Sequence, residues 1–226
     1  MPSVTTLNEE EKGLLRKILR AHAYRQMMAA NIRGHGLKFL VDPEGRIGLV
    51  QDLRHILQQV SRVQELYTQI GGGDIRKEAS IKMERIPYPK SRFELATFLA
   101  TSDPAERIAM ETYADSKCEE FAAIAQEDLA YERTATRRSR VLFEEFAADP
   151  DQRPQVQQML SRWLVISLLA LGRPGTAGDR RAVELGLRRR SCAESLDLCM
   201  ERLAPLLEAS GLDRAELQAA GVELPA

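Results

Sequence analysis

The chain has 226 residues, of which 44% are hydrophobic, 29% charged and 5% aromatic. This apolar content is enough for a folded core and excludes an intrinsically disordered chain. The 32 basic and 33 acidic residues nearly cancel. That balance argues against a general nucleic-acid-binding protein, because such a protein needs excess positive charge to displace the counterions of the phosphates.

The three cysteines, Cys118, Cys192 and Cys199, have neither the spacing of a disulfide framework nor that of a zinc knuckle, so we expect reduced thiols. The first residues lack the charged-then-apolar order of a signal peptide. The longest apolar stretch, 164–171, is far shorter than the roughly 20 residues of a membrane span. We therefore expect a cytoplasmic protein with no membrane or nucleic-acid partner.

Two long helices are predicted in the first third of the chain. Asn8 and Glu11 form a capping-box pattern, and the helix that follows should run to about Leu40 with His22 on its apolar face. A second helix should follow residues 41–45 and end at glycines 71–73. Its apolar stripe comprises Leu49, Leu53, Ile56, Leu57, Val60, Tyr67 and Ile70.

The middle of the chain predicts one short and one very long helix. The short helix covers about 93–100. Asp103 is then the predicted N-cap of a helix from Pro104 to about Phe146, with a kink near 134–136 where threonines are mediocre helix formers.

The remaining residues predict a hydrophobic helix over about 154–171, a turn at 172–175 and two or three shorter helices. Asp213 and Glu216 form a further capping-box pattern. The whole pattern predicts an all-α fold in which residues 1–226 form a single helical-bundle domain with extra short C-terminal helices.

Helical bundles often bind metals through Glu-x-x-His pairs, and the sequence contains none. Asp52 and His55 come closest, with a spacing that suits iron or zinc. With the apolar stripe centred between Leu53 and Val60, His55 should lie roughly 120° away, on a flank or in solvent. This orientation favours an exposed helix pair over a metal site.

Two other histidines are candidates for chemistry. His22 is either a hydrogen-bonded core histidine, the interpretation that we favour, or a ligand or acid-base group. His35 lies between Gly34 and Gly36, where we favour a close helix crossing over a ligand site.

Arginine side chains cluster in two parts of the chain. They could bind the phosphates of a coenzyme A ester or an acidic partner, but solvated helix faces with glutamate partners are the favoured interpretation. The two groups are Arg133, Arg137, Arg138 and Arg140, and Arg173, Arg180, Arg181, Arg188, Arg189 and Arg190.

Four segments together resemble one family. They are Pro43-Glu44-Gly45, IPYPKSRF at 86–93, QEDLAYERT at 126–134 and SRWLVISLLALGRPGTAGDRR at 161–181. In order and spacing they are similar to the ferritin-like subunits of phenylacetic acid catabolism, which form the multicomponent phenylacetyl-CoA epoxidase. The resemblance implies a ferritin-like four-helix bundle.

In that family the catalytic subunit carries a non-haem diiron site, and a related structural subunit has the same fold without a competent site. The register that the resemblance implies places the ligand positions of the first two helices at Gly36, Leu57 and Val60, which cannot bind iron. The third-helix ligand falls near Asp103, and the last Glu-x-x-His pair becomes Asp128 and Tyr131, which we expect to form a hydrogen-bonded remnant in the core.

The resemblance and the missing ligands favour a non-catalytic scaffold without a cofactor, which associates with itself as a homo-oligomer or with an oxygenase partner subunit. One alternative is an active non-haem iron oxygenase subunit with an unusual ligand set drawn from His22, Asp52, His55, Asp103 and Asp128. Another is a bundle that binds an acyl-CoA or other anion through its arginines.

Overall fold

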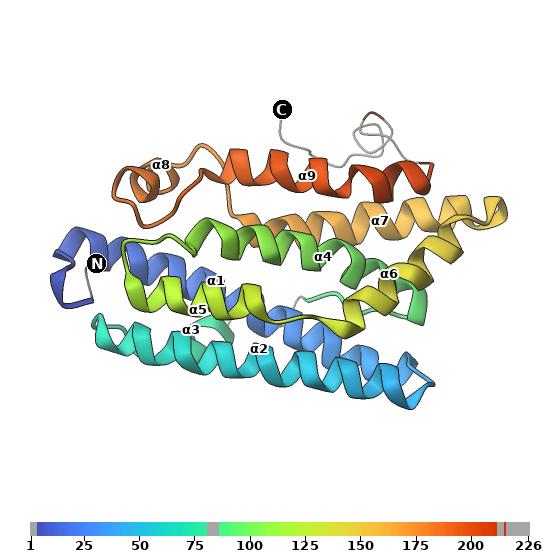
Figure 1. Ribbon diagram of the computed structural model, residues 1–226, viewed down its shortest axis with the longest axis horizontal. Helices are drawn as coiled ribbons and strands as arrows, with labels where there is room; N and C mark the ends of the chain where they lie inside the picture. Colours follow the sequence, from blue (N-terminus) through green and yellow to red (C-terminus); the bar gives the residue numbers. More distant parts are fainter. Residues whose placement is uncertain (1–3, 81–85, 212–214, 216–226) are drawn as a thin grey trace.

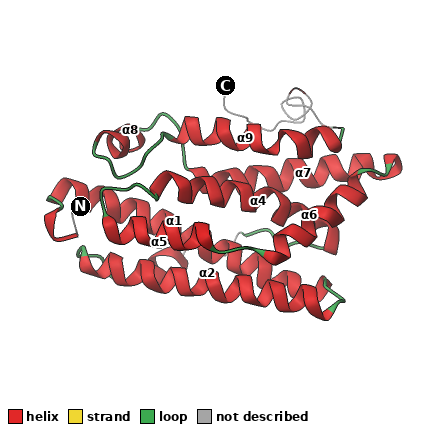
Figure 2. Cartoon of the chain, in the orientation of Figure 1, coloured by secondary structure: helices red, strands yellow, loops and turns green. Residues whose placement is uncertain are grey.

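The computed structural model of the chain describes residues 4–80, 86–211 and 215 (Figure 1). Within these ranges all regular secondary structure is helical, which confirms the predicted all-α class (Figure 2). The α-helices of the described residues are α1 (Glu9–Gly36), α2 (Pro43–Gln69), α3 (Ile75–Ser80), α4 (Arg92–Tyr113), α5 (Glu119–Ala130), α6 (Thr134–Ala147), α7 (Arg153–Leu168), α8 (Ala177–Glu184) and α9 (Cys192–Ala209). None of them has the length and apolar character needed to cross a bilayer.

Helix α4 lies at the centre of the molecule, where it contacts α1, α5, α6, α7 and α9. Helix α2 packs along α1 on one side of this centre, and α7 and α9 cover the other side (Figure 1). Short 3₁₀ segments at Leu37–Phe39 and Leu169–Leu171 follow α1 and α7 directly.

The predicted start of the first helix is confirmed. The Asn8 side chain accepts a hydrogen bond from the Glu11 amide at 3.0 Å, and the Glu11 carboxylate accepts one from the Asn8 amide at 2.8 Å. The second helix ends at Gln69, just before the predicted glycine run. Its N-cap is Asp42.

The predicted helix from 104 to 146 is wrong. Helix α4 begins at Arg92 and continues through Pro104, so Asp103 lies inside a helix and is not an N-cap. The chain then breaks twice, at 114–118 and at 131–133, the second break just preceding the predicted kink. The predicted capping box at 213 and 216 lies outside the described residues.

Distant residues stabilise the first of these breaks. The Lys117 amide donates to the Gly186 carbonyl at 2.7 Å, and the Arg189 amide donates to the Thr112 carbonyl at 2.8 Å. The C-terminal part of the chain thus supplies hydrogen-bond partners that a continuing helix would otherwise provide.

The expected close crossing at Gly36 is confirmed. A Cβ atom added there would lie 2.5 Å from a methyl carbon of Leu95, so α1 and α4 approach more closely than an alanine would allow. Gly34, two residues earlier, has no such neighbour within 4 Å. The three cysteines are free thiols, as predicted, and all three are buried.

Candidate functional site

Helix α2 turns most of its predicted apolar stripe to the core, since Leu49, Ile56, Val60 and Tyr67 are buried, but the buried face also extends to polar positions. Its buried face carries Asp52, His55 and Gln59 between apolar residues, whereas Leu57, predicted to be buried, is 53% exposed. The prediction that His55 lies on a flank or in solvent is therefore wrong, because this residue is only 9% exposed. Locating the stripe by apolar residues alone rotated the expected face, since three buried positions are polar.

His55 and Asp52 contact the end of α5. The Nε2 atom of His55 lies 2.8 Å from Oδ1 of Asp128. The Tyr131 ring stacks on the His55 ring, with centroids 3.9 Å apart, and its hydroxyl donates to Asp52 at 3.1 Å. Asp128 and Tyr131, expected to be hydrogen-bonded inside the core, are so in the structure.

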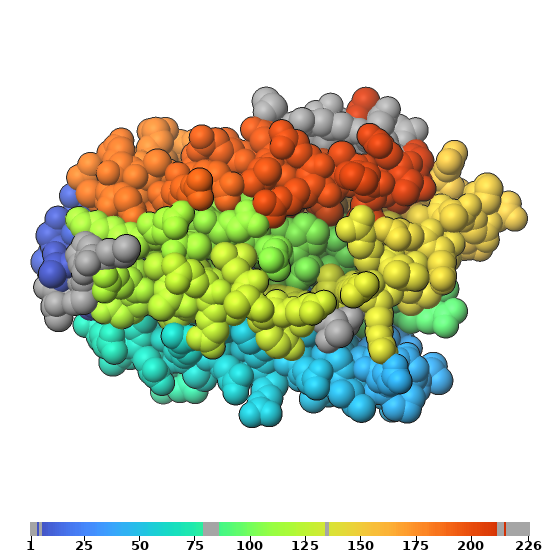
Figure 3. Space-filling model, in the orientation of Figure 1, coloured from blue at the N-terminus to red at the C-terminus, as the bar shows by residue number. Residues whose placement is uncertain are grey.

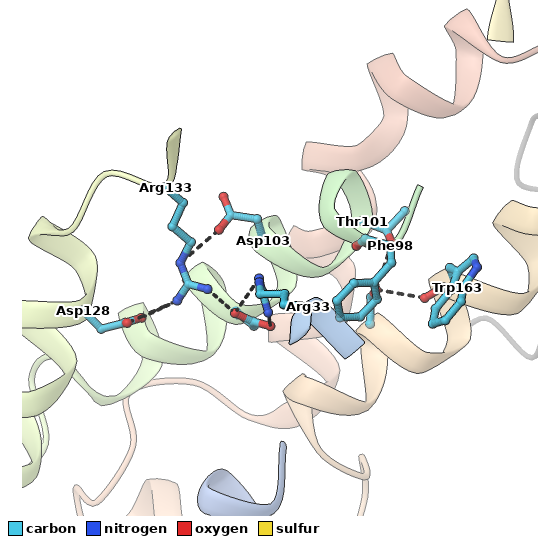
Figure 4. Close-up of polar contacts among 9 residues, drawn as sticks. Arg33, Phe98, Thr101, Asp103, Asp128, Arg133 and Trp163 are labelled. Atoms are coloured by element: carbon cyan, nitrogen blue, oxygen red, sulfur yellow. Dashed lines mark hydrogen bonds and ion pairs between the residues drawn. The ribbon is translucent and has the colours of Figure 1, made fainter. Parts of the chain in front are cut away.

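Arg133, at the break between α5 and α6, binds three carboxylates (Figure 4). Its Nε atom lies 3.2 Å from Asp103, Nη1 lies 2.5 Å from Glu106, and Nη2 lies 3.2 Å from both oxygens of Asp128. The side chain is only 7% exposed. The guanidinium group therefore joins α4 to the end of α5.

Arg33 approaches the same carboxylates from α1. It is fully buried, and its Nη1 and Nη2 atoms lie 3.3 and 3.5 Å from the two oxygens of Glu106. Its guanidinium group also lies 5.5 Å from the centre of the Phe98 ring. Glu106 is thus held between two guanidinium groups.

These side chains form one connected group, buried except for the half-buried Asp103 and Tyr131, which we call the polar cluster. Its members are Arg33, Asp52, His55, Asp103, Glu106, Asp128, Tyr131 and Arg133. They come from α1, α2, α4, α5 and the break before α6. The cluster contains four carboxyl groups and two guanidinium groups. Its net charge therefore depends on which of the carboxyl groups are protonated.

The environment shifts the pKa values of the acidic side chains in different directions. Burial raises the pKa of Asp52 and of Asp103, although nearby arginines act against this shift. Burial also acts to raise the pKa of Asp128, but the hydrogen bond from His55 and the charge of Arg133 outweigh it and lower that pKa. Burial together with Asp52 raises the pKa of Tyr131 to about 12.

Arg133 stays charged in this setting. Burial acts to lower its pKa, but the carboxylates of Glu106, Asp128 and Asp103 outweigh burial and raise it. A charged guanidinium group is the partner that buried carboxylates need when they cannot reach water.

The polar cluster does not suit the iron site of the alternative oxygenase. Oxygens of Asp103, Glu106 and Asp128 already contact guanidinium groups at 2.5–3.5 Å, and Asp52 accepts a hydrogen bond from Tyr131. A metal ion at the same oxygens would lie beside one or two buried positive charges. Among the described residues, no group of three or more His, Cys, Asp or Glu side chains is placed to hold a metal ion.

Two of the predicted candidates lie apart from the hydrogen bonds described above. His22 is buried with its ring edge-on to Phe121, 5.9 Å between centroids, and burial lowers its pKa to about 4. It is therefore neutral at pH 7, as suits a core histidine. His35 stacks on Tyr88 with centroids 4.6 Å apart.

Most of the arginines in the two predicted groups pair with carboxylates or carbonyls on the surface, as expected. These pairs are Arg138 with Glu44, Arg140 with Glu144, Arg180 with the Gly175 carbonyl, Arg181 with Glu10, Arg189 with Asp115 and Arg190 with Glu111. The surface interpretation is wrong for Arg133 and for Arg188, which is buried against Asp179 at 2.9 Å.

Sequence reasoning missed two members of the polar cluster. Glu106 was not among the candidates, although its spacing of three from Asp103 places both on one side of a helix. Arg33 gave a weaker signal, a lone cation near the apolar face of the first helix.

No known protein family and no curated protein matches the chain. The polar cluster therefore has to be interpreted from its own chemistry.

Proposed function

We propose that the protein is a non-catalytic helical subunit with a ferritin-like bundle, similar to the structural subunit of phenylacetyl-CoA epoxidase. It acts as a scaffold that associates with itself or with an oxygenase partner subunit. The observation that carries the proposal is the clamping of Glu106 between Arg33 and Arg133. Side chains that would have to be free for a metal are engaged in holding helices together.

The physical argument concerns the charge of the core. Carboxylates buried without a counterion are costly, and a bundle can offset that cost with a metal or with its own cations. The single side chain of Arg133 contacts Asp103, Glu106 and Asp128, so the protein supplies the positive charge itself. Such a core stabilises the assembled bundle and leaves little open coordination for chemistry.

Metal content is the direct test. The protein purified from iron-supplemented cells should carry little iron by inductively coupled plasma spectrometry, and its visible spectrum should lack iron-dependent absorption. Stoichiometric iron with oxygen-dependent turnover would overturn the proposal.

The scaffold role is tested by association. Size-exclusion chromatography with light scattering should give a defined homo-oligomer, or a stable complex when the chain is co-expressed with the catalytic subunit of a phenylacetyl-CoA epoxidase. A strictly monomeric chain that does not bind that subunit would contradict this role.

One observation favours the alternative function, an iron oxygenase subunit. Asp52, His55, Asp103 and Asp128, four of the five ligands of the alternative iron oxygenase, do lie in the polar cluster. If this alternative holds, Asp128→Ala and His22→Ala should each abolish metal binding and activity. Unchanged iron content in both variants would dismiss it.

A further inference from the structure

An apolar cavity lies at one end of the molecule, outside the polar cluster. We call it the end cavity; its volume is about 470 Å³. The turn between α1 and α2, the first half of α4 and the middle of α6 enclose it, with Phe39, Leu40, Leu99 and Leu142 among its walls. Figure 3 shows this end of the molecule, where α6 (yellow) lies against the first turns of α2 (blue).

The size and lining of the end cavity suit a small organic molecule. Small-molecule sites usually span about 300–1,000 Å³ and are mainly apolar, with a few polar groups that fix the orientation of the ligand. Its inner wall includes Leu99, which is only 1% exposed, and its outer wall includes Val41, which is 86% exposed. The cavity therefore opens to solvent on one side.

Two arginines line the end cavity and differ in their partners. Arg138 pairs with Glu44 at 2.7 Å and lies 3.7 Å from Asp42. Arg92 has no carboxylate within 4 Å among the residues that the structure describes, and its guanidinium group lies 4.7 Å from the centre of the Phe93 ring. Among the described residues, Arg92 thus brings to this cavity a guanidinium group that no carboxylate pairs with, whereas Arg138 and Asp42 of the same lining pair with each other.

We propose that the end cavity binds a small amphipathic carboxylate. Its apolar body packs against Leu40, Leu99 and Leu142, and its carboxylate pairs with Arg92. A guanidinium group binds a carboxylate through two parallel hydrogen bonds from its edge, and it can stack on an aromatic ring through its face, as Arg92 lies over Phe93. An amine or a neutral head group cannot make this pair.

Octanoate is a suitable probe, with 1-octanol and octylamine as head-group controls on the same chain. Isothermal titration calorimetry of the full protein should show saturable binding of octanoate at one site. Octanol should bind about tenfold more weakly, and octylamine more weakly still, because each loses the charge-assisted pair. Octanol binding as tightly as octanoate would overturn the proposal, as would no binding of octanoate.

Two variants locate the site. Arg92→Met should weaken octanoate binding about tenfold or more, and Arg140→Met, an exposed arginine of α6 outside the cavity, should leave it unchanged. Leu142→Trp should fill the cavity and abolish binding, with the helical circular dichroism retained. Equal affinity of Arg92→Met and the unmodified protein would show that Arg92 does not recognise the carboxylate.

Discussion

Arg133 is the residue on which most of the buried charge depends. It contacts three carboxylates, those of Asp103, Glu106 and Asp128. In the sequence it is grouped with Arg137, Arg138 and Arg140, a pattern that predicts a solvated helix face. Its burial follows from the full break at 131–133, where the sequence pattern predicted only a kink, a few residues later.

Arg133→Met should destabilise the protein by about 3–5 kcal/mol, because it leaves Asp103 and Asp128 without their guanidinium partner and Glu106 with Arg33 alone. Denaturant unfolding measures the change. Arg140→Met, which removes a surface pair with Glu144, should change the free energy of unfolding by no more than about 0.5 kcal/mol. A loss below about 1 kcal/mol for Arg133→Met would contradict the role of this residue.

His22 should make stability depend on pH. Burial lowers its folded pKa from 6.5 to about 4, so between these values the unfolded chain binds more protons than the folded one. Stability is then complete above pH 6.5 and falls as the pH drops towards 4, by up to roughly 3 kcal/mol.

The comparison with His22→Gln isolates this contribution from that of the acids. Thermal unfolding is measured between about pH 5 and 7, where histidine titrates in the unfolded chain. The melting temperature of the unmodified protein should depend more steeply on pH than that of the variant. Parallel profiles would mean that His22 is not neutral and buried in the folded state.

At the scale of the helices, sequence patterns predicted starts better than interiors. The capping box at Asn8 and Glu11 is local, so it is visible in four residues. The breaks within the predicted 104–146 helix depend on distant contacts. One of them is the hydrogen bond of Lys117 with Gly186, 69 positions apart in the sequence. The rotated face of α2 was missed for a related reason, since only the other helices make Asp52 and His55 buried.

The crossing of α1 and α4 gives a matched pair of variants on one helix. Gly36→Ala should destabilise the protein by about 1–3 kcal/mol, because the added methyl group overlaps Leu95. Gly34→Ala should stabilise it by about 0.5–1 kcal/mol, because its surroundings are open and alanine favours the helix. Melting temperatures of the two variants should move in opposite directions; a shared direction would rule out the tight crossing.

For the whole molecule, the all-α class was predictable because it needs only helical periodicity and the absence of strand patterns. The composition of the polar cluster was only partly predictable. Asp52, His55, Asp103, Asp128 and Tyr131 were candidates, but the carboxylate Glu106 and the cations that neutralise the group emerged from the packing of five segments of the chain.

The contacts of the polar cluster also bear on how the chain folds. Arg33 and Glu106 are 73 positions apart, as are His55 and Asp128, and Asp52 and Tyr131 are 79 apart. Long loops must close before such contacts form, and their charges must leave water only when every partner is in place. We therefore expect the cluster to form after the folding transition state, so that Arg133→Met speeds unfolding in stopped-flow experiments and leaves the folding rate nearly unchanged. The lifetime of the folded molecule is then set by the unfolding rate, which depends on the contacts that form last.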